Sequence, residues 1–240
     1  SVFIIERSGF DAFFVFYTAI GAVSFLGVMT LPPEPADAYG EGAGFEEIRV
    51  KDIARLFEGK TVRSSYLGII IASALGGILM TYVSIYIGEY TDIANPALYF
   101  TLYAGIGSLS SAVIGRLSDR YGRRTFVLPV MLMMAFGLFF LVFLPSIPTL
   151  VFVLSAVTAG IGYHSGLAIF ISRVVDGADR RMKATALAFQ ESSIDIGISM
   201  GIFLFGLALG ISDYPMLFAV LGVAAAAAPV IVLVLDGEGR

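Results

Sequence analysis

The chain lacks the residues on which disulfide scaffolds and metal centres depend, and it is poor in charge. Its 240 residues include no cysteine, no tryptophan and one histidine, and 14% of them are charged. The absence of cysteine excludes disulfide frameworks, thiol catalysis and cysteine-based metal sites, and a single histidine argues against a histidine-based metal site. Without tryptophan, an aromatic belt at a membrane surface would have to come from the 11 tyrosines.

Hydrophobic residues are in large excess. They make up 58% of the chain, and the mean hydropathy is +0.89. A soluble domain of this length cannot hide that much apolar surface. The apolar residues run continuously instead of alternating, which favours spanning helices over a β-barrel. We therefore predict an all-α integral membrane protein.

Seven apolar stretches are long enough to cross a bilayer, because a helix needs about 20 residues to span a hydrocarbon core about 30 Å thick. They are Phe10–Thr30, Val62–Gly88, Ala97–Ile114, Phe126–Leu144, Leu150–Ser172, Ala184–Leu209 and Tyr214–Leu235. Position 1 is serine and no signal peptide precedes the first stretch, so we expect the chain to be part of a longer protein.

The basic residues predict the orientation of the chain. Arg7 lies on one side of the membrane, and the other Lys and Arg residues fall on the opposite side. They lie in the linker after the first stretch, in the loops after the third and fifth, and at the C-terminus, with Arg173 counted as a loop residue. Because cytoplasmic loops carry the excess of basic residues, we expect an outside N-terminus and a cytoplasmic C-terminus in the plasma membrane.

The most distinctive loop follows the third stretch and covers residues 115–124. It carries four arginines, one aspartate and two glycines. Glycines permit a sharp turn and close helix approach, and an arginine or a helix end can stabilise an aspartate at the membrane boundary. A plain positive-inside loop is the alternative, although charge bias alone requires neither the glycines nor the aspartate.

Seven residues of this loop form a recognisable pattern: Gly115, Leu117, Asp119, Arg120, Gly122, Arg123 and Arg124. The pattern resembles the cytoplasmic signature of the major facilitator superfamily of secondary transporters, which follows the second helix of that family and is often repeated after the eighth. By that resemblance the loop is a conformational latch. Its partner would lie on the family's fifth helix, which this chain lacks.

The surroundings of the signature indicate which copy it is. A long charged linker lies two stretches before it, and four stretches follow it. By resemblance this arrangement corresponds to helices six to twelve of the family. Residues 1–30 are then the last helix of the N-terminal half. Residues 31–61 are a cytoplasmic linker with a short amphipathic helix at Glu46–Glu58, and residues 62–240 are the C-terminal six-helix domain.

Two carboxylates lie inside the sixth stretch. Glu191 and Asp195 are four residues apart and share one helix face, about 10 Å and about 16 Å from the cytoplasmic end. Gly197, Gly201 and Ala208 form a small-residue surface on the roughly opposite side. Ionisable groups inside a membrane are costly, which favours a function: binding protons or attracting a cationic substrate. A structural hydrogen-bond network is the alternative for both.

Three further residues are candidates for the same site. His164 in the fifth stretch would titrate or simply hydrogen-bond within a helix interface. Tyr82 and Tyr86, four residues apart in the second stretch, would line a pocket or belong to an interfacial belt. No nucleophile triad and no nucleotide loop is present, and we expect no enzyme activity, no cofactor and no nucleic-acid partner.

The resemblance implies secondary active transport of a small solute by alternating access. We predict proton-coupled efflux by antiport, because the last two stretches are similar to the drug- and sugar-efflux branches. The expected partners are a small-molecule substrate, protons, the lipid bilayer and the missing N-terminal half. One alternative is proton-coupled uptake of a sugar or another metabolite. A more distant one is a seven-helix receptor, although the last stretch has no lysine for a retinal Schiff base.

Overall fold

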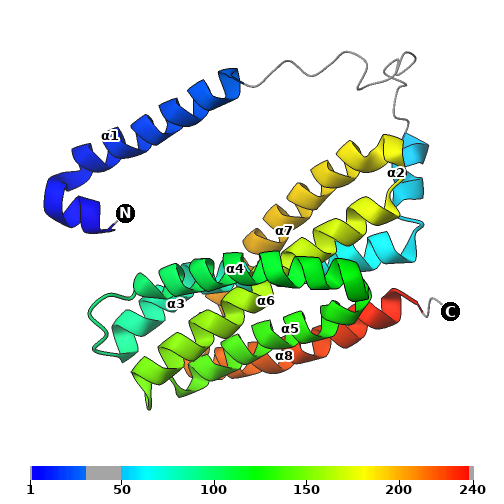
Figure 1. Ribbon diagram of the computed structural model, residues 1–240. Coiled ribbons are helices and arrows are strands. Elements are labelled where there is room, and N and C mark those ends of the chain that lie inside the picture. The colour runs from blue at the N-terminus through cyan, green and yellow to red at the C-terminus, as the bar shows by residue number, and fades with distance from the viewer. Residues whose placement is uncertain (1, 31–49, 238–240) are drawn as a thin grey trace. The chain divides into compact units, whose positions relative to one another are not determined.

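The computed structural model describes residues 2–30 and 50–237, and these residues form helices and connecting turns without strands (Figure 1). The chain divides into two compact units, Ser1–Ile48 and Arg49–Arg240. In the first unit the described element is α1 (Val2–Met29), which contains the apolar segment Phe14–Gly27. The all-α membrane fold predicted from the sequence is confirmed.

The second unit contains one short helix and six long ones. The short helix is α2 (Val50–Leu56), and two single 3-10 turns lie at Leu141–Phe143 and Arg180–Met182. The long helices are α3 (Lys60–Tyr90), α4 (Leu98–Tyr121), α5 (Arg123–Phe140), α6 (Pro148–Gly177), α7 (Lys183–Leu209) and α8 (Tyr214–Leu235). All six are long and apolar enough to cross a membrane, and each overlaps one of the predicted stretches two to seven. The fourth stretch, Phe126–Leu144, runs past the end of α5 through the 3-10 turn at Leu141–Phe143.

Local sequence explains where several of these helices begin. Asp213 caps α8 by accepting a hydrogen bond from the Met216 backbone N–H at 2.9 Å, and prolines occupy the first turns of α6 and α8. Gly122 separates α4 from α5 with φ of +92° and ψ of 127°. A side chain at this position would be strained, so the second glycine of the signature loop is required by the turn.

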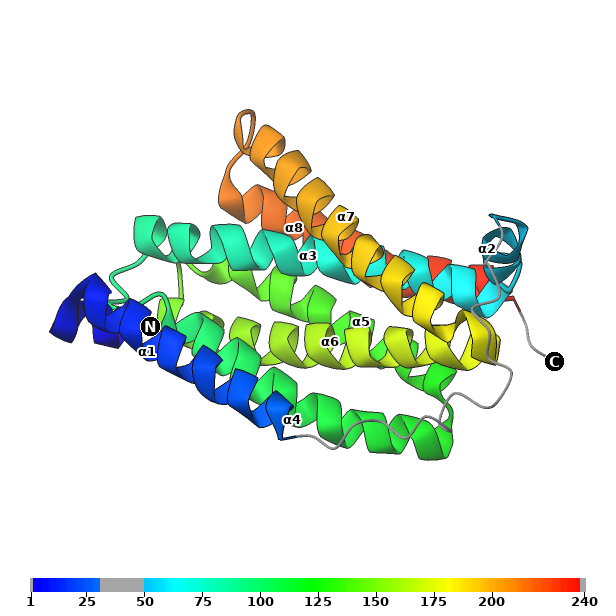
Figure 2. The same ribbon diagram turned by 90° about the horizontal axis from the view of Figure 1, so that it is seen from above.

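The long helices pack in the order α7, α3, α6, α4, so α7 and α4 lie on opposite sides of the central pair (Figure 2). Helix α5 packs between α6 and α8, and α8 also contacts α3. Close helix contacts depend on glycine. A side chain at Gly197 or Gly201 of α7 would collide with the α3 backbone, which confirms the predicted small-residue surface at these two positions.

The short helix α2 packs against the long helices of the second unit. Leu56 is buried, and the Phe57 ring lies 5.2 Å from the Tyr66 ring and 5.4 Å from the Phe189 ring. These contacts place α2 against the ends of α3 and α7. The first four residues of the predicted amphipathic helix, 46–49, lie outside the described residues.

Two helices leave most of their surface uncovered. Only 17% of the apolar window of α4 and 22% of that of α7 is buried, against 56% for both α3 and α6. Helix α4 carries a stripe of small residues along one uncovered face: Thr101, Ala104, Gly105, Ser108, Ala112 and Gly115. A side chain added at Gly105 or Gly115 would meet no atom within 4 Å. These two helices therefore present the surfaces on which a site shared with another part of the protein could form.

Candidate functional site

The signature loop forms ion pairs within the chain. The Asp119 carboxylate accepts from Arg123 Nε at 3.3 Å and from Nη2 at 3.0 Å, one helical turn away. Arg123 Nη1 lies 2.9 Å from Asp176 Oδ2 on α6, a contact of charges without an aligned hydrogen bond. Arg123 therefore bridges the end of α4 to the end of α6.

Arg124, the last arginine of the loop, is connected to a buried network. Arg124 Nε lies 3.0 Å from Asp236 Oδ2, and Arg173 Nη2 lies 2.7 Å from Asp236 Oδ1. The side chains of Arg173 and Asp236 are each 5% exposed. Ser64 donates to Asp236 at 3.3 Å, and Arg173 Nε donates to Ser65 at 3.2 Å. The network joins α3, α5, α6 and the residue after α8 at what we name the signature end of the bundle.

Sequence analysis missed this network. It ended the fifth stretch at Ser172 and counted Arg173 as a loop residue, whereas α6 continues to Gly177 and buries the Arg173 guanidinium. That placement in a loop was wrong, because an ion pair with Asp236 offsets the cost of burial. The available signal was weak: an arginine and an aspartate that each directly follow an apolar stretch.

Opposing effects set the pKa of the Asp236 carboxyl. Burial raises this pKa, but the hydrogen bond and the positive charge of Arg173 lower it, with help from Thr61 and Arg124. The balance holds the pKa of Asp236 below its ordinary value of 3.8. The carboxyl is therefore ionised at neutral pH.

This lowered pKa makes stability depend on pH. A carboxyl whose pKa is lower in the folded state stabilises it fully above the unfolded-state pKa, about 3.9 for Asp. The stabilisation is lost as the pH falls through the lower, folded-state pKa. Unfolding curves of the wild type and of Asp236→Asn should therefore differ most near neutrality and converge below about pH 4. A difference that stays constant into the acid range would contradict this assignment.

The outer face of the loop is open. The Asp119 side chain is 64% exposed, and Gly115, one turn before it, has free space beside it. Among the described residues, the Asp119 carboxylate has one ion-pair partner, Arg123.

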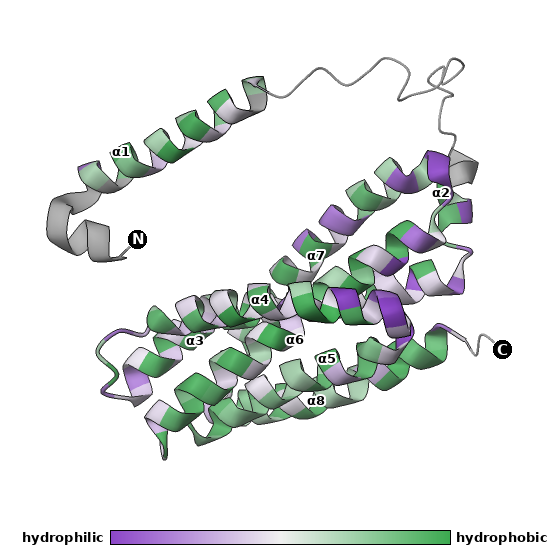
Figure 3. Ribbon diagram, in the orientation of Figure 1, coloured by the Kyte–Doolittle hydropathy of each residue, from purple (hydrophilic) through white to green (hydrophobic). Residues whose placement is uncertain are grey.

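The two carboxylates of α7 point away from the bundle. Glu191 and Asp195 are exposed, as are Ala188 and Ser199 on the same face. Gln190 donates to Glu191 at 3.0 Å, while no hydrogen bond or ion pair involves Asp195 among the described residues. Hydrophilic patches interrupt α7 along its length (Figure 3). Two carboxylates on an uncovered face of a spanning helix require water or another protein surface beside them, since lipid would not solvate them.

His164 lies in the interface between α4 and α6. Its ring centroid is 5.3 Å from those of Tyr103 and Tyr163, and its side chain fills the space beside Gly107. The His164 Nε2 and Tyr103 Oη atoms are buried without hydrogen-bond partners. His164 faces α4, whereas α7 packs chiefly against α3. The structure therefore does not bring His164 together with the two carboxylates of α7.

The two candidate tyrosines of α3 bond to backbone carbonyls. Tyr82 donates to the Ile202 carbonyl at 3.0 Å, and Tyr86, fully buried, donates to the Leu141 carbonyl at 3.0 Å. The Tyr86 ring stacks on Tyr214 at 5.0 Å. Tyr86 is thus placed in the core, and of the pair only Tyr82, half-buried against α7, lies near an uncovered surface.

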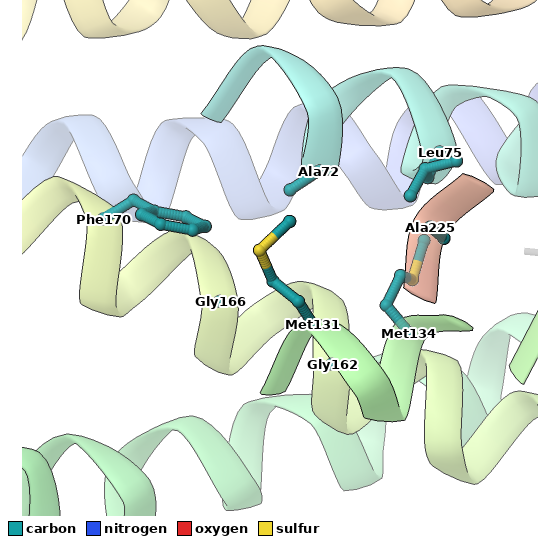
Figure 4. A pocket seen from close by; sticks show the side chains of 8 residues that line it. All are labelled: Ala72, Leu75, Met131, Met134, Gly162, Gly166, Phe170 and Ala225. Carbon is teal, nitrogen blue, oxygen red and sulfur yellow. The ribbon is translucent and has the colours of Figure 1, made fainter. Parts of the chain in front are cut away.

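A closed pocket inside the bundle is too small for a solute. It lies among α3, α5, α6 and α8, where Met131 and Met134 face Ala72, Leu75 and Phe170 (Figure 4). The free space is about 10 Å³, which fits one water-sized sphere, and its lining is apolar. This pocket therefore has no room for a solute.

Comparison with known families identifies the family. The model of the Major Facilitator Superfamily matches residues 65–239, which include α4 to α8 and nearly all of α3. The chain belongs to the Major Facilitator Superfamily. No significant match was found among curated proteins or among solved structures.

Membership in the Major Facilitator Superfamily states what kind of protein this is. Members are transporters, so this chain is a multi-pass membrane protein of the transporter class, with a small molecule as the expected substrate. Transporters of this type bind substrate between two halves near the middle of the membrane.

Proposed function

We propose that the protein is a secondary active transporter that exports a small solute in exchange for protons by alternating access. The α7 face with Glu191 and Asp195 carries this proposal. Its carboxylates lie within a spanning helix, are exposed, and among the described residues have no basic partner. A carboxylate that takes up and releases a proton within a spanning helix would couple solute movement to a proton gradient.

The missing cover of this face is the N-terminal half of the same transporter. Helices α4 and α7 are the two least buried spanning helices, and both have open faces of small or polar residues. Small residues allow helices from another half to approach closely. In the proposed orientation the protein lies in the plasma membrane, with the signature end on the cytoplasmic side.

The signature loop is proposed to act as the cytoplasmic latch. Arg123 and Arg124 are already bound to Asp176 and Asp236, so these contacts hold the loop rigidly on this half. The exposed Asp119 and the open Gly115 are then presented to a helix of the other half. The contact would form in one state of the transport cycle and break in the other.

Asp195→Asn should uncouple the conformational equilibrium from pH. These 240 residues contain no cysteine, so Ser199→Cys, one turn from Asp195, gives a single reporter on the exposed face once any cysteine in the rest of the full-length protein has been replaced. In the full-length protein, a membrane-impermeant thiol reagent should modify Cys at this position at a rate that depends on pH. One coupled proton changes such an equilibrium by up to about tenfold per pH unit.

Two companion variants make the outcome specific. Glu191→Gln tests the carboxylate closer to the signature end, and Ser192→Ala changes an exposed polar residue of the same helix without removing charge. A flat pH profile in Asp195→Asn with a normal profile in Ser192→Ala supports proton coupling at Asp195. An unchanged profile in both carboxylate variants would show that neither group carries the coupled proton.

A further inference from the structure

The four arginines of the signature loop divide into two pairs. Arg123 and Arg124 form ion pairs with aspartates. Arg116 and Arg120 are exposed, and neither has an ion-pair partner among the described residues. They are four residues apart on α4, so their guanidinium groups extend from the same face of the helix. The contacts proposed for the latch involve neither Arg116 nor Arg120.

The same face of α4 is apolar toward the membrane interior. Leu109 and Val113 precede Arg116 by two turns and one turn, and their side chains are 72% and 57% exposed. Bulky aliphatic side chains distinguish this face from the small-residue stripe beside it. The small-residue stripe suits contact with another helix. An exposed aliphatic face that ends in cations matches a molecule with an apolar chain and an anionic head.

A tyrosine marks the level of the membrane surface. Tyr121 is 60% exposed, and the Arg120 guanidinium carbon lies 5.4 Å from the centre of its ring. Tyrosines favour the boundary between lipid and water, and a cation over an aromatic ring is held in place by the ring's negative face. Arg116 and Arg120 therefore lie at the depth of lipid headgroups.

We propose that Arg116 and Arg120 bind the phosphate of an anionic phospholipid whose acyl chains lie along Leu109 and Val113. Arginine suits this role, because its planar guanidinium can donate two hydrogen bonds to one phosphate. The bound lipid holds α4 at a fixed depth beside the signature loop. In the proposed orientation the site faces the cytoplasmic leaflet, where anionic lipids produce a negative surface potential.

The test compares lipids retained by the purified full-length protein. Wild type and R116Q/R120Q are reconstituted in nanodiscs of phosphatidylcholine with a minor fraction of phosphatidylglycerol, and native mass spectrometry counts the lipids that stay bound. We expect phosphatidylglycerol to be preferred by the wild type. The double variant should bind it about fivefold more weakly for each arginine removed. R116K/R120K keeps both charges and should retain most of the preference.

The matched control is R63Q/R180Q, which removes two other exposed arginines at the signature end. It should leave the phosphatidylglycerol preference unchanged, and inorganic phosphate should not displace the lipid because it has no acyl chains. Equal loss in the control would reduce the effect to general surface charge and overturn the proposal. A wild type without lipid preference would overturn it too, and would show that protein covers this face.

Discussion

Replacing Asp236 by alanine is expected to lower the free energy of unfolding by about 3–5 kcal/mol. The variant leaves the Arg173 guanidinium, 5% exposed, without its carboxylate partner at 2.7 Å. A buried charge that loses its partner keeps the full cost of leaving water, and Ser65 alone offsets little of that cost. Thermal or denaturant unfolding of the purified full-length protein in detergent measures the difference directly.

Two further variants separate the ion pair from a general effect of charge. Asp119→Ala removes an aspartate that is 64% exposed and should change stability by less than about 1 kcal/mol. Asp236→Leu combined with Arg173→Met replaces both charges by apolar groups and should recover most of the loss. If Asp236→Ala costs no more than Asp119→Ala, the buried network does not stabilise the bundle.

Gly160→Ala is expected to be among the most damaging single methyls added to the helix interfaces. The new Cβ would collide with the backbone carbonyl of Tyr103 on α4, and a backbone cannot rotate away as a side chain can. Helices α4 and α6 would have to separate, at a cost of about 3 kcal/mol. The measurement is again the free energy of unfolding, together with the yield of folded protein from membranes.

Gly88→Ala is the matched control, because it adds the same methyl to a spanning helix, α3, at a position outside the close helix contacts and outside the small-residue stripe of α4. No atom lies within 4 Å of its new Cβ, and alanine is the better helix former. The variant should therefore be neutral or more stable by up to about 1 kcal/mol. Equal losses in the two variants would mean that helix propensity, and not the α4–α6 contact, determines the result.

The spanning helices could be predicted from the sequence because their signal is local. Each predicted stretch from Val62 onward overlaps one long helix, although Phe126–Leu144 runs four residues past the end of α5, and the glycine surface of α7 meets α3 as expected. Hydropathy over about 20 residues and the spacing of small residues need no knowledge of the rest of the chain. The turn at Gly122 was likewise predictable, since its signal is a glycine between two apolar runs.

The network at the signature end could not be predicted in the same way. Arg173 and Asp236 lie on elements far apart in the sequence, and the packing of α3 and α5 against both α6 and α8 brings them together. The end of α6 was also uncertain from sequence, because an arginine after an apolar stretch usually remains in water. Which face of α4 or α7 stays uncovered depends on the same packing and had no local signal.

The position of Asp236 has a consequence for biogenesis. Arg173 leaves the ribosome two membrane helices earlier than the carboxylate that neutralises it. Until α8 has been inserted, the signature end holds the Arg173 guanidinium without its carboxylate partner, and Arg124 on α5 lacks the same partner. Insertion of α8 therefore completes this network, and a premature stop before Asp236 should leave a product that cellular quality control recognises.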